Sequence, residues 1–397
     1  MSTSGVYQQV YQLLKRHFDD GVDESSRTRL ALLVTGMIGA KSASPARVAN
    51  ALHTLGLRDA KAESLERQIR RLENDPEIEA ATCFHPFARW RLLYGKPQRM
   101  LLIVDPTLQE DRVVMLSVAI WYRGRALPLA WMTWAANVPL EGKRFWERLE
   151  ELLNLVAGLL PAGVPVICMA DRAFGTPAFI DLLIQHSWHY IVRAQGQTLC
   201  RDCTGRERSL KSLVPAPGSR AKLAGQVFKK SGWRTASVVA HWDGRYASPL
   251  CLVSDLPPEW NLLALYRRRY PIEAMFRDYK SAGWRWEQGQ VKDLRHLERL
   301  LVGMALATWI ALFVGTQVAQ EILARAPSGK RHTRPWEGKF SLFTLGLNRL
   351  HEWMADTGKV HPIWQLSDWD APNWATQVRA HHAHAFIFAC YANFAAF

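Results

Sequence analysis

Two short apolar runs, each leading into an aspartate, place the strongest constraint on the fold of this chain. Residues 100–104 read Met-Leu-Leu-Ile-Val and are followed by Asp105, and residues 164–170 read Val-Pro-Val-Ile-Cys-Met-Ala and are followed by Asp171. Continuous apolar runs of this length are typical of buried strands. Side chains at the ends of neighbouring strands can converge on one site. We therefore expect a sheet that brings Asp105 and Asp171 together.

The sequence around these runs predicts a mixed sheet. Strand-like segments close to one another come first, and helices then alternate with strands. This order is typical of an α/β fold in which helices cover both faces of the sheet. The expected elements are strands at 112–121, 126–134 and 189–193, a hairpin turn at 122–125, and helices at 140–160 and 177–186.

Helices are expected in the chain on either side of this region. Apolar residues recur at helical spacing within residues 1–95 and within a long segment at 259–324. In the first of these, two short helices at 46–55 and 63–72 flank Gly56, and the second helix is basic. Such a pair suggests a DNA-binding helix-turn-helix, although many helix pairs simply pack against each other. Both interpretations stay open.

Residues 300–320 contain no charged side chain and are long enough to cross a bilayer. The stretch is rich in Ala, Gly and Thr, and no second stretch resembles it, so we expect a buried core helix. The polar N-terminus lacks the apolar stretch of a signal peptide. Six cysteines are too few for a disulfide scaffold in 397 residues. We expect a soluble cytoplasmic protein with no membrane partner.

The charge of the chain favours a polyanionic partner. It has 50 basic and 36 acidic residues, a net charge of +14. Half of this excess lies in the strand-rich residues 196–250, which hold 10 basic and 3 acidic residues, so we expect this segment to bind DNA. Its tryptophans suit stacking on an extruded base, and core packing explains them equally well. The candidate residues are Lys229, Lys230, Trp233, Arg234, Trp242 and Arg245.

Two carboxylates at one site repel each other unless a proton or a divalent cation neutralises them. Hard oxygen ligands of this kind favour Mg²⁺ or Mn²⁺. The convergence of Asp105 and Asp171 would therefore indicate a metal site. For either aspartate alone, a turn or a helix cap is the simpler explanation.

A third acidic residue lies in a segment with a specific charge pattern. Residues 266–280 read Tyr-Arg-Arg-Arg-Tyr-Pro-Ile-Glu-Ala-Met-Phe-Arg-Asp-Tyr-Lys. At about 100° per residue, a helix would hold four of them within an arc of about 60°. The carboxylate could complete a metal site, and the two cations could hold phosphates. A solvated charged face is the alternative, and Pro271 would either kink the helix or begin a new one. The four residues are Tyr266, Arg269, Glu273 and Lys280.

The spacing Tyr-x2-Arg-x3-Glu-x6-Lys resembles, without a gap, the YREK signature of the insertion-sequence-four family of bacterial DDE transposases. The run that ends in Asp105 resembles the first aspartate block of this family. Residues 169–175, Met-Ala-Asp-Arg-Ala-Phe-Gly, resemble its second block, and residues 341–350 are similar to a weaker downstream block. The resemblance therefore spans roughly residues 99–350.

The resemblance implies a ribonuclease-H-like mixed sheet interrupted by a β-strand insertion domain. It makes Asp105, Asp171 and Glu273 the catalytic triad, the ligands of two Mg²⁺ ions for which Mn²⁺ can substitute. The basic segment lies between Asp171 and Glu273, where the family carries its insertion. Tyr270, where tryptophan is common, and Pro271 depart from the pattern and affect only the local helix geometry.

The function implied is that of a DNA transposase. It would bind terminal inverted repeats, cleave the ends of the element through hairpin intermediates and join 3′-hydroxyl ends to target DNA. It would act as a homodimer at the bacterial nucleoid. Arg269 and Lys280 would hold DNA phosphates, and Tyr266 would position the strand. Two other functions stay open: a metal-dependent nuclease of the same fold without strand transfer, and a catalytically idle DNA-binding relative.

The resemblance also divides the chain, because the insertion would split the catalytic domain in two. The terminal parts resemble the family only in general character. The expected domains are a helical N-terminal DNA-binding domain (1–95), the two parts of the catalytic domain (96–195 and 251–325), the β-strand insertion domain (196–250) and a helical C-terminal region for dimerisation (326–397).

Overall fold

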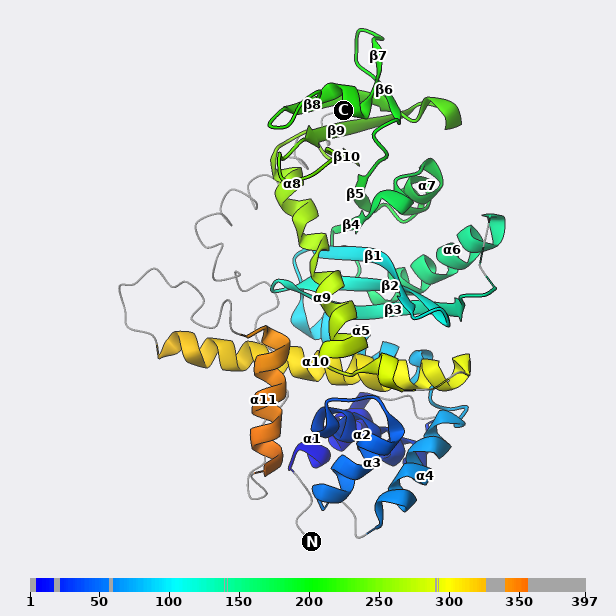
Figure 1. The fold of residues 1–397 in the computed structure, drawn as a ribbon, viewed down its shortest axis with the longest axis vertical. Helices are drawn as coiled ribbons and strands as arrows, with labels where there is room; N and C mark the ends of the chain where they lie inside the picture. The colour runs from blue at the N-terminus through cyan, green and yellow to red at the C-terminus, as the bar shows by residue number, and fades with distance from the viewer. Residues whose placement is uncertain are drawn as a thin grey trace.

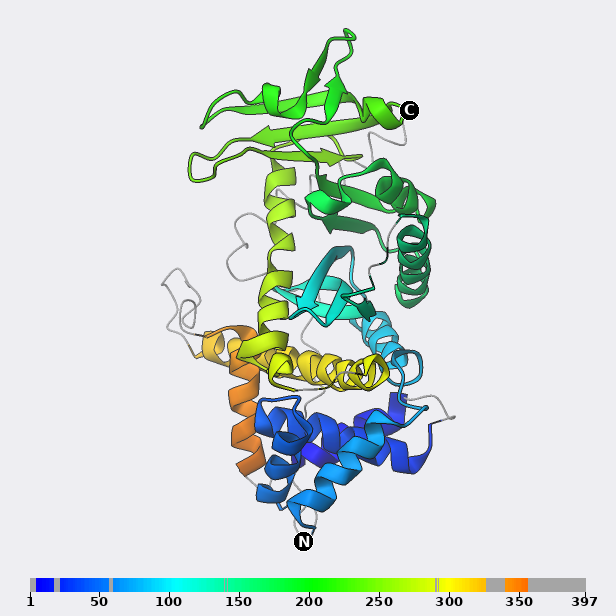
Figure 2. The same cartoon turned by 45° about the vertical axis from the view of Figure 1, so that its right-hand side comes forward.

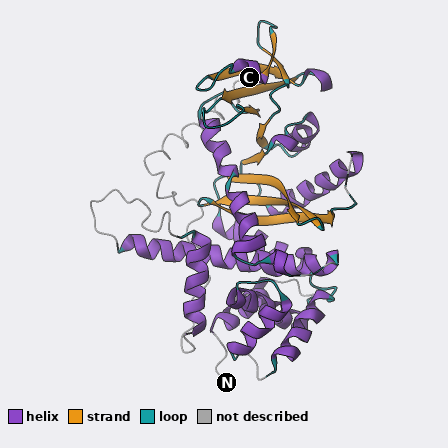
Figure 3. Ribbon diagram, in the orientation of Figure 1, coloured by secondary structure: helices purple, strands orange, loops and turns teal. Residues whose placement is uncertain are grey.

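The computed structural model of the chain describes residues 5–17, 22–56, 60–138, 140, 142–289, 291, 293–325 and 340–355. Helices gather at the end of the molecule that holds the N-terminus, and strands extend toward the opposite end (Figures 1 and 3). The long helix α10 (Leu294–Ala324) crosses between the two regions.

Ten strands form one sheet in the order β3-β2-β1-β4-β5-β10-β9-β8-β6-β7. β1, β4 and β5 run parallel to one another, and the other neighbouring pairs are antiparallel. The predicted mixed α/β sheet is confirmed, including its hairpin and its alternation of helix and strand. The strands are β1 (Met100–Gln109), β2 (Val113–Tyr122), β3 (Arg125–Ala135), β4 (Val166–Ala170), β5 (His189–Arg193), β6 (Leu199–Arg201), β7 (Glu207–Ser209), β8 (Arg220–Val227), β9 (Arg234–His241) and β10 (Leu250–Ser254).

The strands of the basic segment continue the same sheet. β10 pairs with β5, where Ser254 lies opposite Ile191, and β9, β8, β6 and β7 follow outward. The basic segment therefore joins the central strands by main-chain hydrogen bonds. The domain boundaries expected near residues 195 and 250 stay predictions.

The first strand is longer than its apolar run predicted. β1 continues to Gln109, so Asp105 lies inside a strand and the expectation that it follows the strand end was wrong. The reason is pairing with β2, which holds Asp105 opposite Ser117 and continues beyond it. On its other side, β1 pairs with β4 only as far as Val104 opposite Ala170. Asp105 therefore lies where one of its two neighbouring strands ends.

Helices cover both faces of these strands. In Figure 2 the α8–α9 segment lies on one side of the central strands and α6 and α7 on the other. Each helix turns an apolar stripe to the sheet: α6 buries Leu149, Leu153 and Val156, and α9 buries Ile272 and Met275. The bounds are α6 (Gly142–Leu159), α7 (Pro177–Gln185), α8 (Asn261–Tyr266) and α9 (Pro271–Arg277).

Helix α10 is the uncharged segment for which a core helix was expected. Its length and composition would suffice to cross a membrane, but 89% of its most apolar stretch is buried in the protein. It packs against β3, α2 (Glu24–Ala40) and α11 (Leu342–Ala355). At the crossing with α11, a Cβ on Gly315 would overlap the carbonyl oxygen of Leu342, and a Cβ on Gly346 would overlap that of Ala311. Glycine at both positions permits this close contact.

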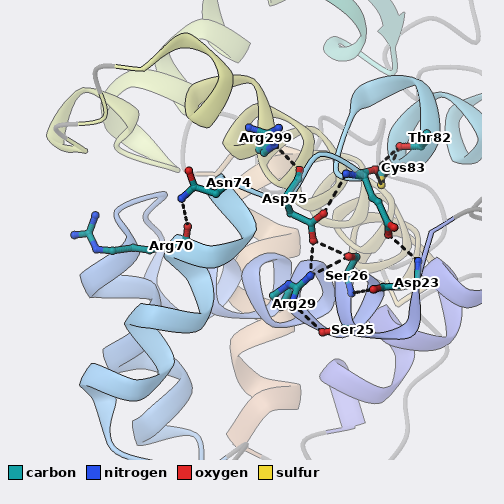
Figure 4. Close-up of polar contacts among 11 residues, drawn as sticks. Asp23, Ser25, Ser26, Arg29, Arg70, Asn74, Asp75, Thr82, Cys83 and Arg299 are labelled. Atoms are coloured by element: carbon teal, nitrogen blue, oxygen red, sulfur yellow. Dashed lines mark hydrogen bonds and ion pairs between the residues drawn. The ribbon is translucent and has the colours of Figure 1, made fainter.

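The N-terminal helices are attached to α10 through Asp75 (Figure 4). This buried carboxylate accepts hydrogen bonds from Ser26 Oγ at 2.6 Å and from Arg29 Nη2 at 2.5 Å. Arg299 on α10 donates from Nε to the Asp75 carbonyl oxygen at 2.6 Å. The predicted helices are present, and α3 and α4 pack against each other. The helices are α1 (Gly5–His17), α2, α3 (Pro45–Thr54), α4 (Ala62–Glu73) and α5 (His85–Gly95).

The C-terminal region is described in part. The block at 341–350 falls almost entirely within α11. Of the expected C-terminal region 326–397, the structure describes only residues 340–355. The predicted role of the remaining residues in dimerisation lies outside the described residues.

Candidate active site

Asp105 and Asp171 come from adjacent parallel strands. Val104 of β1 lies opposite Ala170 of β4. Asp105 and Asp171 are the next residues after this pair, so they lie side by side where the pairing of the two strands ends. Asp105 is 9% exposed. Asp171 Oδ1 accepts a hydrogen bond from the Ala173 amide at 2.8 Å and caps a short 3-10 turn. The structure therefore places the two predicted aspartates next to each other. Asp171 also caps a turn, which is the role that its sequence position alone would explain.

Glu273 lies on an almost continuous helical rod made of α8, a 3-10 turn at Arg267–Arg269, and α9. Pro271 takes the first position of α9, where a missing N–H costs no hydrogen bond. Tyr270 before it keeps right-handed helical angles (φ −56°, ψ −30°). Pro271 therefore begins a helix without breaking the rod.

Arg269 connects the first and third acidic residues. Its Nη1 donates to Asp105 Oδ2 at 3.0 Å, and its Nη2 donates to Glu273 Oε1 at 3.1 Å. The guanidinium is also 5.9 Å from the ring centre of Tyr266 and 5.4 Å from that of Tyr270. Arg269 and Glu273 thus share one face of the rod, as predicted, and Arg269 joins that face to β1.

Tyr266 and Lys280 lie differently from what a regular helix predicted. Tyr266 is buried, and burial is the largest cause that raises the pKa of its phenol to about 12. Lys280 lies in a π-helical turn, Asp278–Ala282, with its Nζ 3.9 Å from Glu287 Oε1. In this arrangement Tyr266 supports Arg269, and its contact with DNA stays a prediction.

The three acidic residues influence one another. The pKa of Asp105 is raised to about 6: burial is the largest cause, Arg269 opposes it, and the charges of Asp171 and Glu273 add to it. For Arg269, burial lowers the pKa, but the neighbouring phenol and the same three carboxylates outweigh this effect and raise it. Arg269 thus bonds two of the three carboxylates, and Asp171 lies near enough to affect the charge of both Asp105 and Arg269.

The donor chemistry suits Mg²⁺ or Mn²⁺, because all three side chains offer hard carboxylate oxygens. Within the described residues, however, no three His, Cys, Asp or Glu side chains are grouped closely enough to hold an ion as they stand. Arg269 already contacts one oxygen of Asp105 and one of Glu273. The residues therefore fit a divalent cation once Arg269 has left these two oxygens.

The comparison with protein families concerns the same region. Residues 141–310 match the model of the transposase DDE domain. The match includes Asp171 and Glu273 and begins after Asp105, which the geometry adds to the group. No curated protein matches the sequence of this chain.

Solved structures give weaker similarity. A piggyBac transposase synaptic complex with hairpin DNA is 10% identical, with a TM-score of 0.40, 95% of this chain covered and 87% of that chain. Human ENDOV is 14% identical, with a TM-score of 0.27, 47% of this chain covered and 86% of that chain. Both TM-scores are below 0.5, so neither match bears on the function.

The end of the helical rod that carries Glu273 is held by a buried ion pair that the sequence did not reveal. Arg125 on β3 donates from Nη2 to Asp278 Oδ2, and both side chains are almost fully buried. Asp278 begins the π-helical turn that contains Lys280. The pair therefore fixes the end of the rod to the sheet. No local pattern could have found it, because its members are 153 positions apart.

Three of the four predicted cations of the basic segment form ion pairs with acidic side chains. Lys229 Nζ is 2.5 Å from Glu207 Oε2, Arg234 Nη2 is 2.9 Å from Asp181 Oδ2, and Arg245 Nη2 is 2.6 Å from Asp243 Oδ2. Among the described residues, Lys230 has no ion-pair partner and is exposed. These pairs reduce the free positive charge of the segment.

The two predicted tryptophans of this segment are half-buried beneath cations. The Arg201 guanidinium lies 4.6 Å from the ring centre of Trp233, and Lys211 Nζ lies 5.9 Å from that of Trp242. Trp242 also donates its indole N–H to a carbonyl oxygen at 2.9 Å. A cavity of about 260 Å³ between the start of α7 and the turn that carries Lys230 is lined by neither tryptophan. Base stacking by either tryptophan stays a prediction.

Proposed function

We propose that this chain is a DNA transposase of an insertion sequence, of the insertion-sequence-four type, with a ribonuclease-H-like catalytic fold. The observation that carries the proposal is the convergence of Asp105, Asp171 and Glu273 around Arg269, in and beside residues that match the transposase DDE domain. The strand order β3-β2-β1-β4-β5, with β1, β4 and β5 parallel, supports the ribonuclease-H-like fold.

In this function Asp105, Asp171 and Glu273 would hold two Mg²⁺ ions. Bound there, the ions would lower the pKa of an attacking water or 3′-hydroxyl and stabilise the leaving oxygen. Asp105 is held in β1 opposite Ser117 of β2, and Asp171 directly follows β4, so the two set one side of the site. The Glu273 side chain is 60% exposed, which leaves room for its carboxylate to change position. The same site first cleaves the ends of the element, through hairpin intermediates, and then joins them to target DNA.

DNA is held on both sides of this site. Arg269 and Lys280 bind phosphates of the cleaved strand, the former through its planar fork. The basic segment, above all the unpaired Lys230, binds the flanking duplex, and the N-terminal helices bind the terminal inverted repeat. Two copies of the chain act together, because the two ends of an element must be joined in one reaction.

The test uses the inverted repeats that flank the coding sequence in its source genome. Asp105→Asn, Asp171→Asn and Glu273→Gln should each abolish Mg²⁺-dependent nicking of a labelled end while leaving gel-shift binding of that end intact. Glu147→Gln, an exposed carboxylate on α6, is the matched control and should nick normally. Normal nicking by any one of the three variants would remove that residue from the proposed site.

Two further measurements separate the other functions. Pre-cleaved ends with free 3′-hydroxyls should be joined to plasmid DNA by the wild-type chain. A nuclease without strand transfer would nick the ends and give no joined product. A catalytically idle relative would bind the ends and do neither.

A further inference from the structure

Arg269 occupies the position between two of the three carboxylates. One Nη nitrogen bonds Asp105 Oδ2 and the other bonds Glu273 Oε1, at 3.0 and 3.1 Å. The side chain is only 9% exposed. A buried guanidinium that makes a hydrogen bond through each arm is held firmly, because its alternative is an unpaired buried charge.

A divalent cation would need the same oxygens. Metal ions of this class bind carboxylate oxygens, and a guanidinium bound to those oxygens both blocks them and repels the incoming charge. This agrees with the absence, within the described residues, of three side chains arranged to hold an ion. Arg269 and the metal therefore compete for Asp105 and Glu273.

The two arms of the bridge differ in accessibility. The Asp105 side chain is 13% exposed and the Glu273 side chain is 60% exposed. Tyr270, which packs against the guanidinium, is also on the surface. A phosphate that approaches from the Glu273 side can thus reach Arg269. Its oxygens can accept hydrogen bonds from both Nη nitrogens, as the two carboxylates do.

We propose that Arg269 is an internal counter-ion that keeps Asp105 and Glu273 from binding a divalent cation. The two carboxylates become free for the cation when a DNA phosphate replaces them as the partner of the Arg269 guanidinium. This inference rests on the proposed function. It makes metal binding and DNA binding mutually reinforcing, because each of them separates Arg269 from the carboxylates. Without DNA, Arg269 offsets part of the negative charge of the carboxylates, and the site holds metal poorly.

The experiment measures Mn²⁺ binding to the full chain by electron paramagnetic resonance, with and without a short duplex of the inverted repeat. Arg269→Gln should bind Mn²⁺ about tenfold more tightly than wild type when DNA is absent, because one neighbouring positive charge has been removed. In wild type, DNA should strengthen Mn²⁺ binding, and this gain should be smaller in Arg269→Gln. Arg267→Ala, an exposed neighbour on the same turn, is the control and should match wild type.

A merely structural role for Arg269 predicts the opposite result, since loosening the site would weaken Mn²⁺ binding. Equal or weaker Mn²⁺ binding by Arg269→Gln in the absence of DNA overturns the inference. If that variant does not fold, Arg269→Lys decides: an ammonium cannot bridge both carboxylates as a fork, so its Mn²⁺ affinity should exceed that of wild type. Wild-type affinity in Arg269→Lys then counts against the inference.

The two proposals fail in different ways. If the wild-type chain nicks DNA and the triad variants do not, while Arg269→Gln leaves Mn²⁺ binding unchanged, only the counter-ion inference falls. If the wild-type chain binds no Mn²⁺ even with DNA and nicks nothing, the proposed function itself falls.

Discussion

The buried pair of Arg125 and Asp278 allows a quantitative test of how the helical rod that carries Glu273 is held on the sheet. Their side chains are 11% and 8% exposed. The pKa of Asp278 is raised to about 6, because burial raises it by more than the adjacent Arg125 lowers it. Arg125→Met would leave a carboxylate buried without its partner. We expect a loss of about 3–5 kcal/mol in the free energy of unfolding at pH 8, the usual cost of breaking a buried pair from one side.

The loss should depend on pH with a definite sign. Without Arg125, the folded-state pKa of Asp278 rises further above its unfolded value, so the folded chain binds a proton that the unfolded chain does not. Stability is then greatest at low pH and falls as pH rises through the folded-state pKa, by about 1.4 kcal/mol for each unit of pKa difference. Arg125→Met should therefore be less damaging at pH 5.5 than at pH 8.

Urea denaturation followed by circular dichroism at the two pH values measures both effects. Asp278→Asn alone should also destabilise the chain, and the double variant should lose less than the sum of the two, because it leaves no unpaired charge. Lys143→Met, which breaks the exposed pair with Glu147 on α6, should change stability by less than about 0.5 kcal/mol. A loss in Arg125→Met below about 1 kcal/mol, or equal at both pH values, would refute the reasoning.

Three other outcomes follow from local geometry. Burial raises the pKa of Glu73 from 4.5 to about 7, so the free energy of unfolding should fall as pH rises between these values. In urea denaturation, Glu73→Gln should remove this pH dependence and raise the free energy of unfolding at pH 8 by about 1–3 kcal/mol. Gly315→Ala should lower the melting temperature and cost about 2–3 kcal/mol because its Cβ would meet the Leu342 carbonyl, whereas Gly158→Ala, with open space around it, should gain about 0.5–1 kcal/mol. Lys230→Gln should lower the slope of log affinity for DNA ends against log salt by about one, since one phosphate contact is lost.

The positions of strands and helices were predictable because their signals are local. The apolar runs and the turn at 122–125 placed β2, β3 and β4 to within one or two residues. The end of β1 was not predictable in this way. Asp105 and Pro106 interrupt the apolar run, but pairing with β2 holds both residues in the strand, and such pairing depends on a second segment.

The residues of the candidate site were predictable from type and spacing, and their contacts were not. The helical arc correctly placed Arg269 beside Glu273, because helix geometry fixes neighbours one turn apart. It could not show that the other arm of Arg269 reaches Asp105, 164 positions away. It also placed Lys280 on a regular helix, whereas the structure has a π-helical turn there, next to the Asp278 that Arg125 holds.

The charge of the basic segment also could not be interpreted from the sequence alone, and its ion pairs add detail to the proposed function. Counting residues treats each cation as free, but Arg234 and Arg245 are paired with carboxylates at the surface. Surface pairs contribute only about 0–1 kcal/mol, so a DNA phosphate can displace them at little cost. The Arg269 bridge is buried, and its displacement costs more. Under the proposed function, DNA would therefore be captured first by the surface cations. Arg269 would exchange its carboxylates for a phosphate only when a DNA end lies fully in the site. DNA binding and metal binding are then separate steps. In both, a DNA phosphate replaces a carboxylate as the partner of a cation, first at the exposed surface pairs and then at the buried Arg269.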